Sequence, residues 1–542
     1  SLCNPLRYLL RYDSKRDRSS TKTDAERKEI ERYVVMSEET LHVNEFEKDT
    51  KPVYRSEKNL QQRYGPEANF SYRAHSAEEI LSDKALLREM IMNHHEVQCP
   101  RLAALDDYIK ARNPTIYNAE RRRTEKEKAD YRVAHNFAKI INVFDVGYNT
   151  GVPIKKVSED DKINEMIKEY DRVNDIEALD AELWRDFRKY GRAYELQYRN
   201  QNDEDRSVIS NVFETFVFYG LDVERTPLFA VRYPKYKIGQ EERVSITVYT
   251  DTETITYKPT TVNILNLEEE SRERHYWGEV PITEYSPDRY RQGGYEDVTS
   301  LIDLYDAAES DSANYMSDFN EATLAITGDL DMNRYTVQDM IDMKNANMLL
   351  LSNGINPDGS KTQTDAKYIY KQYDVTGAEA YKERLQKDIH KISFVPDLTD
   401  ESFAGTQSGE AMKYKLFGFQ QVCKTSQRGF KKGLMRRYRL LLNIKNFVQE
   451  ADNADLGELQ IVFTPNLPKA ILEELKALAD AGAQFSQETL LGLASFIEDA
   501  QAEMEKVKEE EEENKTDLVL KQMFSPVQSS AEEEVRADEG ES

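Results

Sequence analysis

Hydrophobic residues recur at helical spacing in the first part of the chain. Between residues 76 and 128, Ile80, Leu87 and Ile91 belong to a series of apolar positions that follow the three- and four-residue steps of an amphipathic helix. A second stretch, residues 130–146, shows the same spacing. The pattern therefore predicts helices throughout this part of the chain.

The period changes to two between residues 190 and 290. Val244, Ile246 and Val248 alternate with Ser245 and Thr247, and tyrosine and threonine become abundant. This alternation is typical of strands with one buried face. The sequence therefore predicts an antiparallel sheet that follows the helices, and an α+β fold.

Helical spacing returns at residues 295–322 and 377–393, with a turn-rich segment between them. The first of these two stretches contains eight acidic residues and no lysine or arginine. Residues 396–409 are mostly small and polar, which is typical of a loop. Within it, Ser408 is suited to be the N-cap of a following helix.

A long helix is predicted over residues 409–449. It would be about 60 Å long if straight, and Gly418, Gly429 and Gly433 predict a bend. Between Ala411 and Gln449 there are ten basic residues and no acidic one. Positive charge is thus concentrated in this segment.

The chain as a whole is acidic. The 542 residues include 74 Lys and Arg against 100 Asp and Glu, a net charge of −26. Such a surface repels phosphate backbones and disfavours a general nucleic-acid coat protein. The three cysteines, Cys3, Cys99 and Cys423, are too scattered for a disulfide framework. No apolar run approaches the ~18 residues of a membrane span, and no signal-like segment opens the chain, so we expect a soluble protein with free thiols, made in the cytoplasm.

Catalytic and cofactor motifs are missing from the sequence. There is no G-x-x-x-x-G-K-[ST] loop, no G-x-G-x-x-G, no H-E-x-x-H and no G-x-S-x-G. His94, His95 and Cys99 lack a second ligand pair at zinc-finger spacing, and we expect them on a helix surface. We therefore predict no catalytic residues, no metal and no cofactor.

The basic residues of the long helix form two series at i, i+4 and i+7. The first comprises Lys424, Arg428 and Lys431, and the second Lys432, Arg436 and Arg439. They could form a solvated face that pairs with an acidic helix of a neighbouring subunit, such as residues 295–322. Alternatively, they could contact phosphates directly.

Four separated motifs occur in an order that resembles one family. They are residues 403–416 (FAGTQSGEAMKYKL), 132–137 (RVAHNF), 191–195 (GRAYE) and 295–305 (YEDVTSLIDLY). In these motifs the chain resembles the portal proteins of tailed bacteriophages, specifically of long-tailed phages that infect Gram-positive hosts. The similarity covers nearly everything after Met36.

The resemblance implies a ring, typically a dodecamer, at one capsid vertex of the virion. Double-stranded DNA would pass through it without sequence specificity during packaging and ejection. The implied partners are the terminase large subunit, a head-completion adaptor, and the major capsid and scaffolding proteins, with assembly in the host cytoplasm and no membrane involved. A channel of this kind needs a wall that does not bind the polyanion tightly, because each neutralised phosphate adds affinity.

The resemblance also divides the chain after Met36 into regions, whereas residues 1–35 match nothing in the family and the tail is inferred from its acidic composition. The expected order is a flexible or non-native extension (1–35), a helical and extended region (36–129), an α/β wing (130–290), stem helix 1 (291–322), a small mixed clip (323–371), stem helix 2 (372–394), a tunnel loop (395–409), a long kinked tunnel helix (410–449), a wing strand and linker (450–468), a helical crown (469–500) and an acidic, largely disordered tail (501–542).

Three sets of residues are the candidate site. The tunnel loop would present Asp400, Ser402, Phe403, Gly405, Thr406, Gln407, Ser408 and Gly409 to DNA. The basic helix would present Lys424, Arg428, Lys431, Lys432, Arg436, Arg437 and Arg439 to a neighbour or to DNA. The acidic wall of the stem would comprise Asp303, Asp306, Glu309 and Asp311.

Two other classes of protein stay open at this point. A DNA-processing enzyme such as a nuclease would cut plasmid DNA with a metal and a carboxylate. A helical capsid scaffold or adaptor would form open or irregular assemblies rather than a closed ring.

Overall fold

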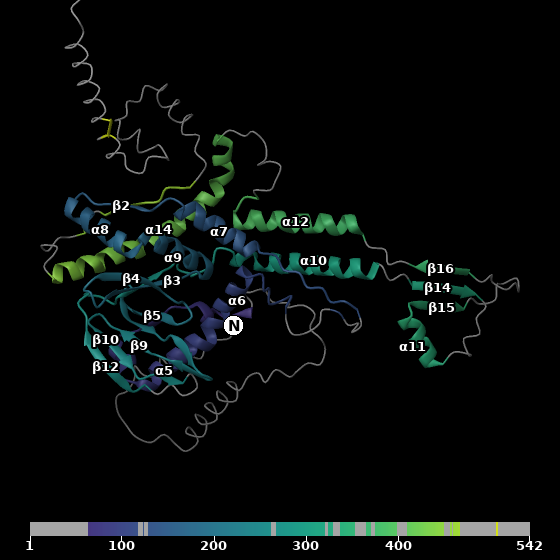
Figure 1. Cartoon of the computed structure of the whole chain (residues 1–542), viewed down its shortest axis with the longest axis horizontal. Coiled ribbons are helices and arrows are strands. Elements are labelled where there is room, and N and C mark those ends of the chain that lie inside the picture. The colour runs from purple at the N-terminus through teal and green to yellow at the C-terminus, as the bar shows by residue number, and fades with distance from the viewer. Residues whose placement is uncertain are drawn as a thin grey trace, which may run out of the picture.

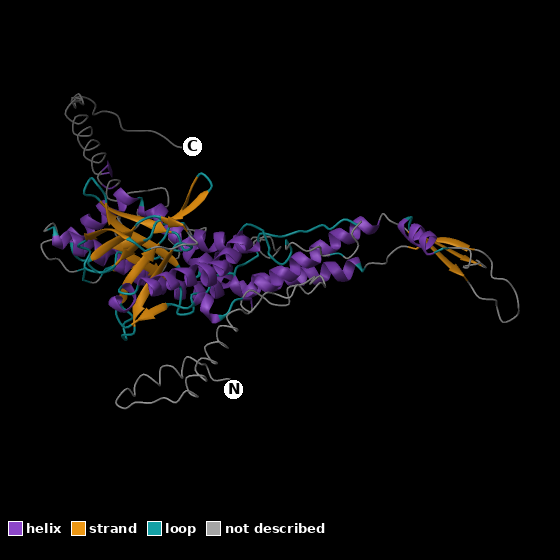
Figure 2. Ribbon diagram, turned by 90° about the horizontal axis from the view of Figure 1, so that it is seen from below, coloured by secondary structure: helices purple, strands orange, loops and turns teal. Residues whose placement is uncertain are grey.

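The computed structural model describes residues 63–117, 123, 128–261, 267–319, 323–328, 336–352, 365–369, 374–397, 409–448, 456–457, 459–466, 504 and 506–507. Figure 1 shows a broad body of helices and sheets from which two helices extend side by side to a small distal unit. Figure 2 shows that strands and helices are interleaved in the body and that the extension is mainly helical. Among the described helices none is long and apolar enough to cross a membrane.

Short helices open the described chain. Ser76 caps the first by accepting a hydrogen bond from the Glu79 N–H, and Asp83 caps the second. A π-helical turn, His94–Gln98, then leads into the third. The elements are η2 (Pro66–Asn69), β1 (Tyr72–Ala74), α4 (Ala77–Leu81), α5 (Lys84–Asn93) and α6 (Cys99–Ile109).

Three further helices cover the next part of the body. They are α7 (Phe137–Thr150), α8 (Asp161–Asn174) and α9 (Ile176–Tyr190), with β2 (Lys155–Val157) between the first two. The helix predicted from residue 130 begins only at Phe137, because residues 131–135 form neither a helix nor a strand. That difference has a specific cause, described below.

The region of period-two alternation forms three sheets. The largest has the order β1-β5-β6-β9-β10-β12, and all its strands pair antiparallel except β1 with β5. A second has the order β13-β3-β4 and a third β11-β8-β7, both antiparallel. The strands are β3 (Ala193–Arg199), β4 (Asp205–Ser210), β5 (Thr215–Gly220), β6 (Pro227–Arg232), β7 (Lys235–Ile238), β8 (Glu241–Val244), β9 (Thr247–Tyr249), β10 (Glu253–Tyr257), β11 (Thr260–Thr261), β12 (Glu269–Arg274) and β13 (Ile282–Tyr285).

The two helices of the extension are α10 (Thr299–Phe319), which follows η4 (Glu296–Val298), and α12 (Val375–Ser393). They confirm the helices predicted at 295–322 and 377–393. Between them in sequence lies the distal unit, with sheet order β15-β14-β16. Its elements are β14 (Thr323–Gly328), α11 (Val337–Asn345), β15 (Met348–Ser352) and β16 (Asp365–Ile369). The combination of helices with mainly antiparallel strands confirms the α+β class.

The long helix α14 (Gly409–Phe447) crosses the body, and Figure 1 shows it changing direction near its beginning. Two of its glycines permit close packing rather than a bend. A Cβ atom on Gly433 would lie 2.2 Å from the ring of Tyr285, and one on Gly429 would lie 2.3 Å from the Ser286 carbonyl oxygen. The predicted short strand after the helix is β17 (Gln460–Val462), which pairs with β2.

The core has three clusters. One joins α6, α7 and β3 to the first turns of α10 and the end of α12. The second packs α8 and α9 against α14, around Trp184, Phe187 and Phe430. The third lies between the six-stranded sheet and α5. Since α14 contributes to the first two clusters, it ties the base of the extension to the body.

Several predicted regions lie outside the described residues. They are the extension 1–35, the crown 469–500, and the tail apart from Met504, Lys506 and Val507. Of the tunnel-loop residues, Gly409 is the first residue of α14. Outside the described residues lie Asp400, Ser402, Phe403, Gly405, Thr406, Gln407 and Ser408.

Candidate functional site

Helix α10 binds the extended segment 131–135 through a buried polar stripe. Three of its side chains stand four residues apart, and each accepts an N–H from an alternate residue of that segment. The bonds run from Tyr131 N–H to Asn314 Oδ1 (2.7 Å), from Val133 N–H to Ser310 Oγ (3.0 Å) and from His135 N–H to Asp306 Oδ1 (2.9 Å).

The spacing of this stripe explains why the segment is extended. Two extended residues advance about 6.6 Å and four helical residues 6.0 Å, on the order of the same step. Each turn of α10 therefore meets the next backbone N–H that points toward it. The stripe is buried: Asp306 and Ser310 are 0% exposed and Asn314 is 6% exposed. Because these bonds satisfy backbone groups that a helix would satisfy internally, residues 131–135 do not join α7.

The expected acidic wall on α10 is wrong for two of its four residues. Asp306 is fully buried and cannot line an open channel, and the partly exposed Asp303 is bound by side chains of its own chain. Burial raises the pKa of Asp303. The ring of His135 forms a hydrogen bond with Asp306, and this bond raises the pKa of His135. Three of the acids have partners within the chain. Asp306 accepts a hydrogen bond from Asn113 Nδ2 (2.8 Å). Asp303 accepts one from Tyr108 Oη (2.7 Å) and pairs with Arg63 (3.1 Å), and Glu309 pairs with Lys382 (3.2 Å). Asp311 is exposed.

Helices α10 and α12 are joined by an ion pair and by aromatic contacts at their base. Lys382 of α12 is 7% exposed and pairs with Glu309 of α10. At the start of α7, the Phe137 ring lies edge-on to Tyr305 of α10, 5.0 Å between centroids, and 6.2 Å from His390 of α12. The pair is therefore anchored in the body at one end.

The basic face predicted on α14 is wrong for Arg437, which is buried, whereas Arg436 is largely covered and Arg439 is exposed. Arg437 is 0% exposed and forms ion pairs with Asp180 (2.6 Å) and Glu195 (2.7 Å). Arg436 donates to the carbonyl oxygens of residues 280 and 282, and the more exposed Arg439 pairs with Glu279 (2.8 Å). All three have partners in their own chain, and Arg437 cannot reach a neighbour or DNA.

Four further cations of α14 are exposed. They lie at i, i+4 and i+7/i+8 on one face of the helix, which we call the cationic stripe. Within the part of the chain that the structure describes, none of the four has an ion pair or a side-chain hydrogen bond. The stripe consists of Lys424, Arg428, Lys431 and Lys432.

A buried network around Arg437 fixes α14 in the body. Tyr285 Oη donates to Glu195 Oε2 (2.5 Å), and Tyr438 Oη donates to Asp171 (2.7 Å). Glu195 closes the 191–195 motif, whose Gly191 has φ +73° and would carry a Cβ 2.0 Å from the Arg291 carbonyl oxygen. The motif is visible in the sequence, but its role, which is to bury one carboxylate under α14, depends on the tertiary structure.

The expectation that His94 and Cys99 lie on a helix surface is wrong. Both are buried, and His94 Nδ1 lies 2.5 Å from Tyr233 Oη. Burial lowers the pKa of His94 and raises the pKa of the Cys99 thiol. The described residues contain no cluster of three or more His, Cys, Asp or Glu that could hold a metal ion.

The distal unit has little core of its own. The strand register places Leu324, Met348 and Tyr368 on one face of its sheet, and Ala325 with Leu349 on the other. Of its described side chains only Ala325 is buried. A three-stranded sheet with one helix cannot cover two apolar faces. The exposed apolar side chains are Met340, Ile341, Leu349, Leu351, Tyr368 and Ile369, between 42% and 60% exposed.

Comparisons with known proteins identify one family. Residues 88–517 match the family model described as "Phage portal protein, SPP1 Gp6-like". No curated protein matches the sequence. Among solved structures, "Neck of empty GTA particle computed with C6 symmetry" aligns with 12% identity and a TM-score of 0.34, covering 66% of this chain and 90% of that chain. "Virion of native gene transfer agent (GTA) particle" aligns with 14% identity, the same coverage and the same TM-score.

Proposed function

The chain belongs to the family of SPP1 Gp6-like phage portal proteins, and from this premise we propose that it forms a closed ring through which double-stranded DNA is packaged and ejected. As a member of that family it is a structural protein of the portal vertex of the phage particle, not an enzyme. The observation that carries the proposal is the family match over residues 88–517. The arrangement in Figure 1, a body with a two-helix extension and a distal unit, supports it.

We assign the regions accordingly. Residues 130–290 of the body are the wing, α10 and α12 are the stem, and the distal unit is the clip. The clip would dock the terminase during packaging and the head-completion adaptor afterwards. The segment between α12 and α14 would be the tunnel loop, supported by α14. This assignment rests on the element order of the structure and on the resemblance of the sequence motifs.

The distal unit supports assembly into a ring. Leu349, Tyr368 and their apolar neighbours are exposed in the isolated subunit, and exposed apolar surface of this kind is unfavourable in water. In a ring, each distal unit would lie beside two others, which could cover both faces. Such contacts are heterologous and close on themselves.

We assign the cationic stripe of α14 to the contact between adjacent subunits. Each subunit carries a net charge of −26, so bringing copies together without compensating pairs is unfavourable. Strong phosphate contacts would also slow the passage of DNA. Asp303 and Asp306 are engaged inside their own chain, so the stripe would pair with other carboxylates of the neighbour.

Negative-stain electron microscopy of the purified chain tests the ring directly. We expect closed rings with a central hole in views along the symmetry axis, and native mass spectrometry gives the copy number. Open filaments would favour a scaffold or adaptor instead. Metal-dependent cleavage of plasmid DNA that is lost on mutating one carboxylate would favour a nuclease.

The stripe has its own test. The K424E/R428E variant should lower the yield of rings, and added salt should restore part of that yield, because salt screens the like charges that the variant brings together. The matched control is K391E, which reverses an exposed cation on α12 outside the stripe. Unchanged ring yield together with weaker DNA binding would assign the stripe to DNA.

A further inference from the structure

Helix α7 leaves one of its faces uncovered. Its exposed residues share a single strip, because they are spaced at i, i+3 or i+4, and i+7 or i+8 along the helix. The strip, which we call the α7 strip, consists of Lys139, Ile140, Val143 and Gly147. Ile140 is 51% exposed and Val143 is 55% exposed, whereas Ile141 on another face is buried. The α7 strip therefore presents apolar side chains to water, which is unfavourable.

The last described segment of the chain runs toward this strip. Strand β17 pairs antiparallel with β2, the strand after α7, and this pairing places Val462 opposite Lys155. Further along, the N–H of Asn466 donates to the carbonyl oxygen of Tyr148 in α7 (3.0 Å). Figure 1 shows β2 and α7 on the same side of the body. As the segment advances it meets earlier residues of the chain, and at Asn466 it has reached the last turn of α7.

The sequence after Asn466 has a pattern that suits the α7 strip. Apolar residues recur at helical spacing and fall on one face of a predicted helix over residues 469–482. They are Ile471, Leu472, Leu475 and Leu478. Pro468 suits the start of this helix, because a proline is tolerated in the first turn. The predicted helix has 14 residues and so does α7, so both would be about 21 Å long.

We propose that residues 467–482 pack as an antiparallel helix on the α7 strip of their own subunit. Both helices advance by about 1.5 Å per residue. Starting from the backbone hydrogen bond at the last turn of α7, that step brings Ile471 beside Val143 and Leu475 beside Ile140. Each apolar residue of the strip then meets an apolar residue of the segment, and both are removed from water.

The charges of the two helices are complementary. The only charged residue of the α7 strip is Lys139, which is exposed. Glu474 directly precedes Leu475 in the predicted helix. In the antiparallel arrangement, Lys139 and Glu474 flank the apolar contact on the same side, so that the ammonium and the carboxylate would lie together. An exposed ion pair adds little stability, but it favours this register over others.

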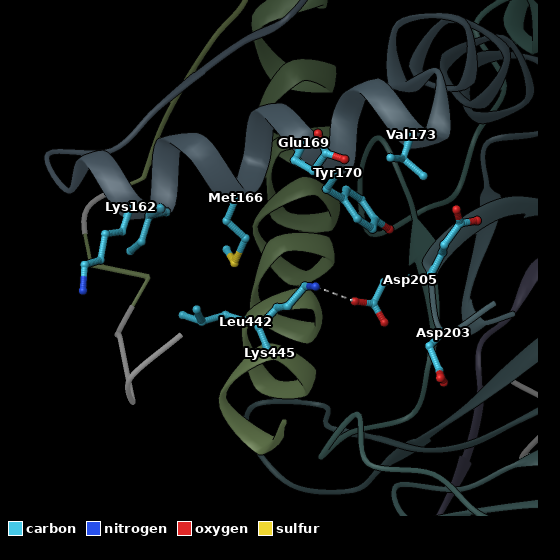
Figure 3. Close-up of a pocket in the computed structure, with 11 residues that line it drawn as sticks. Lys162, Met166, Glu169, Tyr170, Val173, Asp203, Asp205, Leu442 and Lys445 are labelled. Atoms are coloured by element: carbon cyan, nitrogen blue, oxygen red, sulfur yellow. Dashed lines mark ion pairs between the residues drawn. The ribbon is translucent and has the colours of Figure 1, made fainter. Parts of the chain in front are cut away.

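A pocket elsewhere in the body offers this segment no alternative place. It has a volume of about 400 Å³ and lies between α8, the loop before β4 and the last turns of α14. Figure 3 shows charged side chains around it, and Lys445 pairs with Asp205 there (3.3 Å). A helix with its side chains is about 10–12 Å wide, so a helix of this length does not fit in such a volume.

Attachment favours the subunit's own segment over that of a second copy. Residues 467–482 begin at the end of α7, so their effective concentration at the α7 strip is on the order of millimolar. Docking requires only the folded subunit and not the ring. A failure of ring assembly would therefore leave this inference standing, and its own failure would leave the portal assignment standing.

Disulfide trapping in the full-length chain tests the proposal. In a Cys3→Ser background the two remaining cysteines are buried. The Val143→Cys/Ile471→Cys variant should form a disulfide within one chain when it is oxidised with copper phenanthroline, so that it loses both new thiols and still migrates as a monomer on a non-reducing gel. The matched control is Val143→Cys/Glu473→Cys, because Glu473 lies on the opposite face of the predicted helix. We expect at least tenfold less cross-linking in this control.

Hydrogen–deuterium exchange gives a second readout that needs no cysteine. Val143→Glu places a carboxylate in the apolar contact, and the amides of residues 469–482 should exchange at least tenfold faster than in the unmodified chain. The matched control is Val223→Glu, which changes a valine that is already fully exposed and should leave this exchange unchanged.

Three results would contradict the proposal. Equal cross-linking of the two cysteine pairs would overturn it, and so would equal exchange in the V143E and V223E variants. A cross-linked dimer in place of the cross-linked monomer would also overturn it, in favour of a segment from a second copy of the chain.

Discussion

Replacing Arg437 with methionine should destabilise the folded subunit rather than the ring. The guanidinium is 0% exposed and pairs with Asp180 and Glu195, which are 3% and 0% exposed. Asp180 keeps a second cation, Lys156 at 3.2 Å. Glu195 would keep only two neutral donors, the hydroxyl groups of Tyr285 (2.5 Å) and Ser207 (2.6 Å). The variant therefore leaves one buried carboxylate without a counter-charge.

The magnitude follows from that uncompensated charge. Breaking a buried ion pair by removing one partner costs about 3–5 kcal/mol, whereas replacing both partners by neutral groups is often close to neutral. R437M should thus lower the free energy of unfolding by ~3–5 kcal/mol, and R437M/E195Q should recover a large part of that loss. The assay is urea denaturation followed by tryptophan fluorescence, because Trp184 lies in the same core cluster.

The matched control is Arg439→Met. Its side chain is 53% exposed and pairs with Glu279, and exposed ion pairs contribute only about 0–1 kcal/mol. The reasoning is refuted if R437M unfolds at the same urea concentration as R439M. A stable R437M subunit that no longer forms rings would also refute it, and would return Arg437 to a subunit interface.

Three further predictions follow from other contacts. Asp306 raises the pKa of His135, so this pair stabilises the fold fully below the ordinary histidine pKa of ~6.5 and loses its contribution as pH rises through the raised value; urea midpoints should fall less between pH 6 and pH 8.5 in His135→Asn. Gly433→Ala should lower the free energy of unfolding by about 1–3 kcal/mol, because the added Cβ overlaps the tyrosine ring of β13. Gly147→Ala adds a Cβ with nothing within 4 Å of it, and should raise the free energy of unfolding by ~0.5–1 kcal/mol in the same denaturation assay. Asn314→Leu removes two hydrogen bonds to Tyr131, one from its N–H to Asn314 Oδ1 (2.7 Å) and one from Asn314 Nδ2 to its carbonyl oxygen (3.2 Å). The amides of residues 131–135 should then exchange with deuterium faster, by about 0.5–1.5 kcal/mol for each bond lost.

Elements with strong periodicity were predictable from the sequence. The sheet region at 190–290 and the helices α10 and α12 agree with the spacing of hydrophobic residues in the sequence. Each element buries one face, and the residues of that face recur with a period of 2 in a strand or 3.6 in a helix. The helix predicted from residue 130 was partly wrong. Its first residues find hydrogen-bond partners on α10, some 180 residues away in the sequence, and no local pattern encodes such partners.

The candidate site shows the same division. Spacing alone placed Lys424, Arg428 and Lys431 on one face of the helix, and all three are exposed. Arg437 was predicted on the same basic helix but is buried, because Gly433 lets β13 approach α14 closely and Glu195 and Asp180 meet the guanidinium there. A count of charges along a helix cannot separate an arginine that faces water from one that faces two buried carboxylates.

The sequence by itself determined the α+β class, the order of helices and strands, the segregation of charge onto α14 and the resemblance to phage portal proteins. These properties depend on local periodicity, composition and short motifs. Only the tertiary structure decided which charges are available to partners. It buried Asp306 against residues 131–135 and Arg437 against Glu195, it left four cations and the distal apolar residues exposed, and it formed the pocket at Asp205, because each outcome depends on contacts between segments that are far apart in the chain.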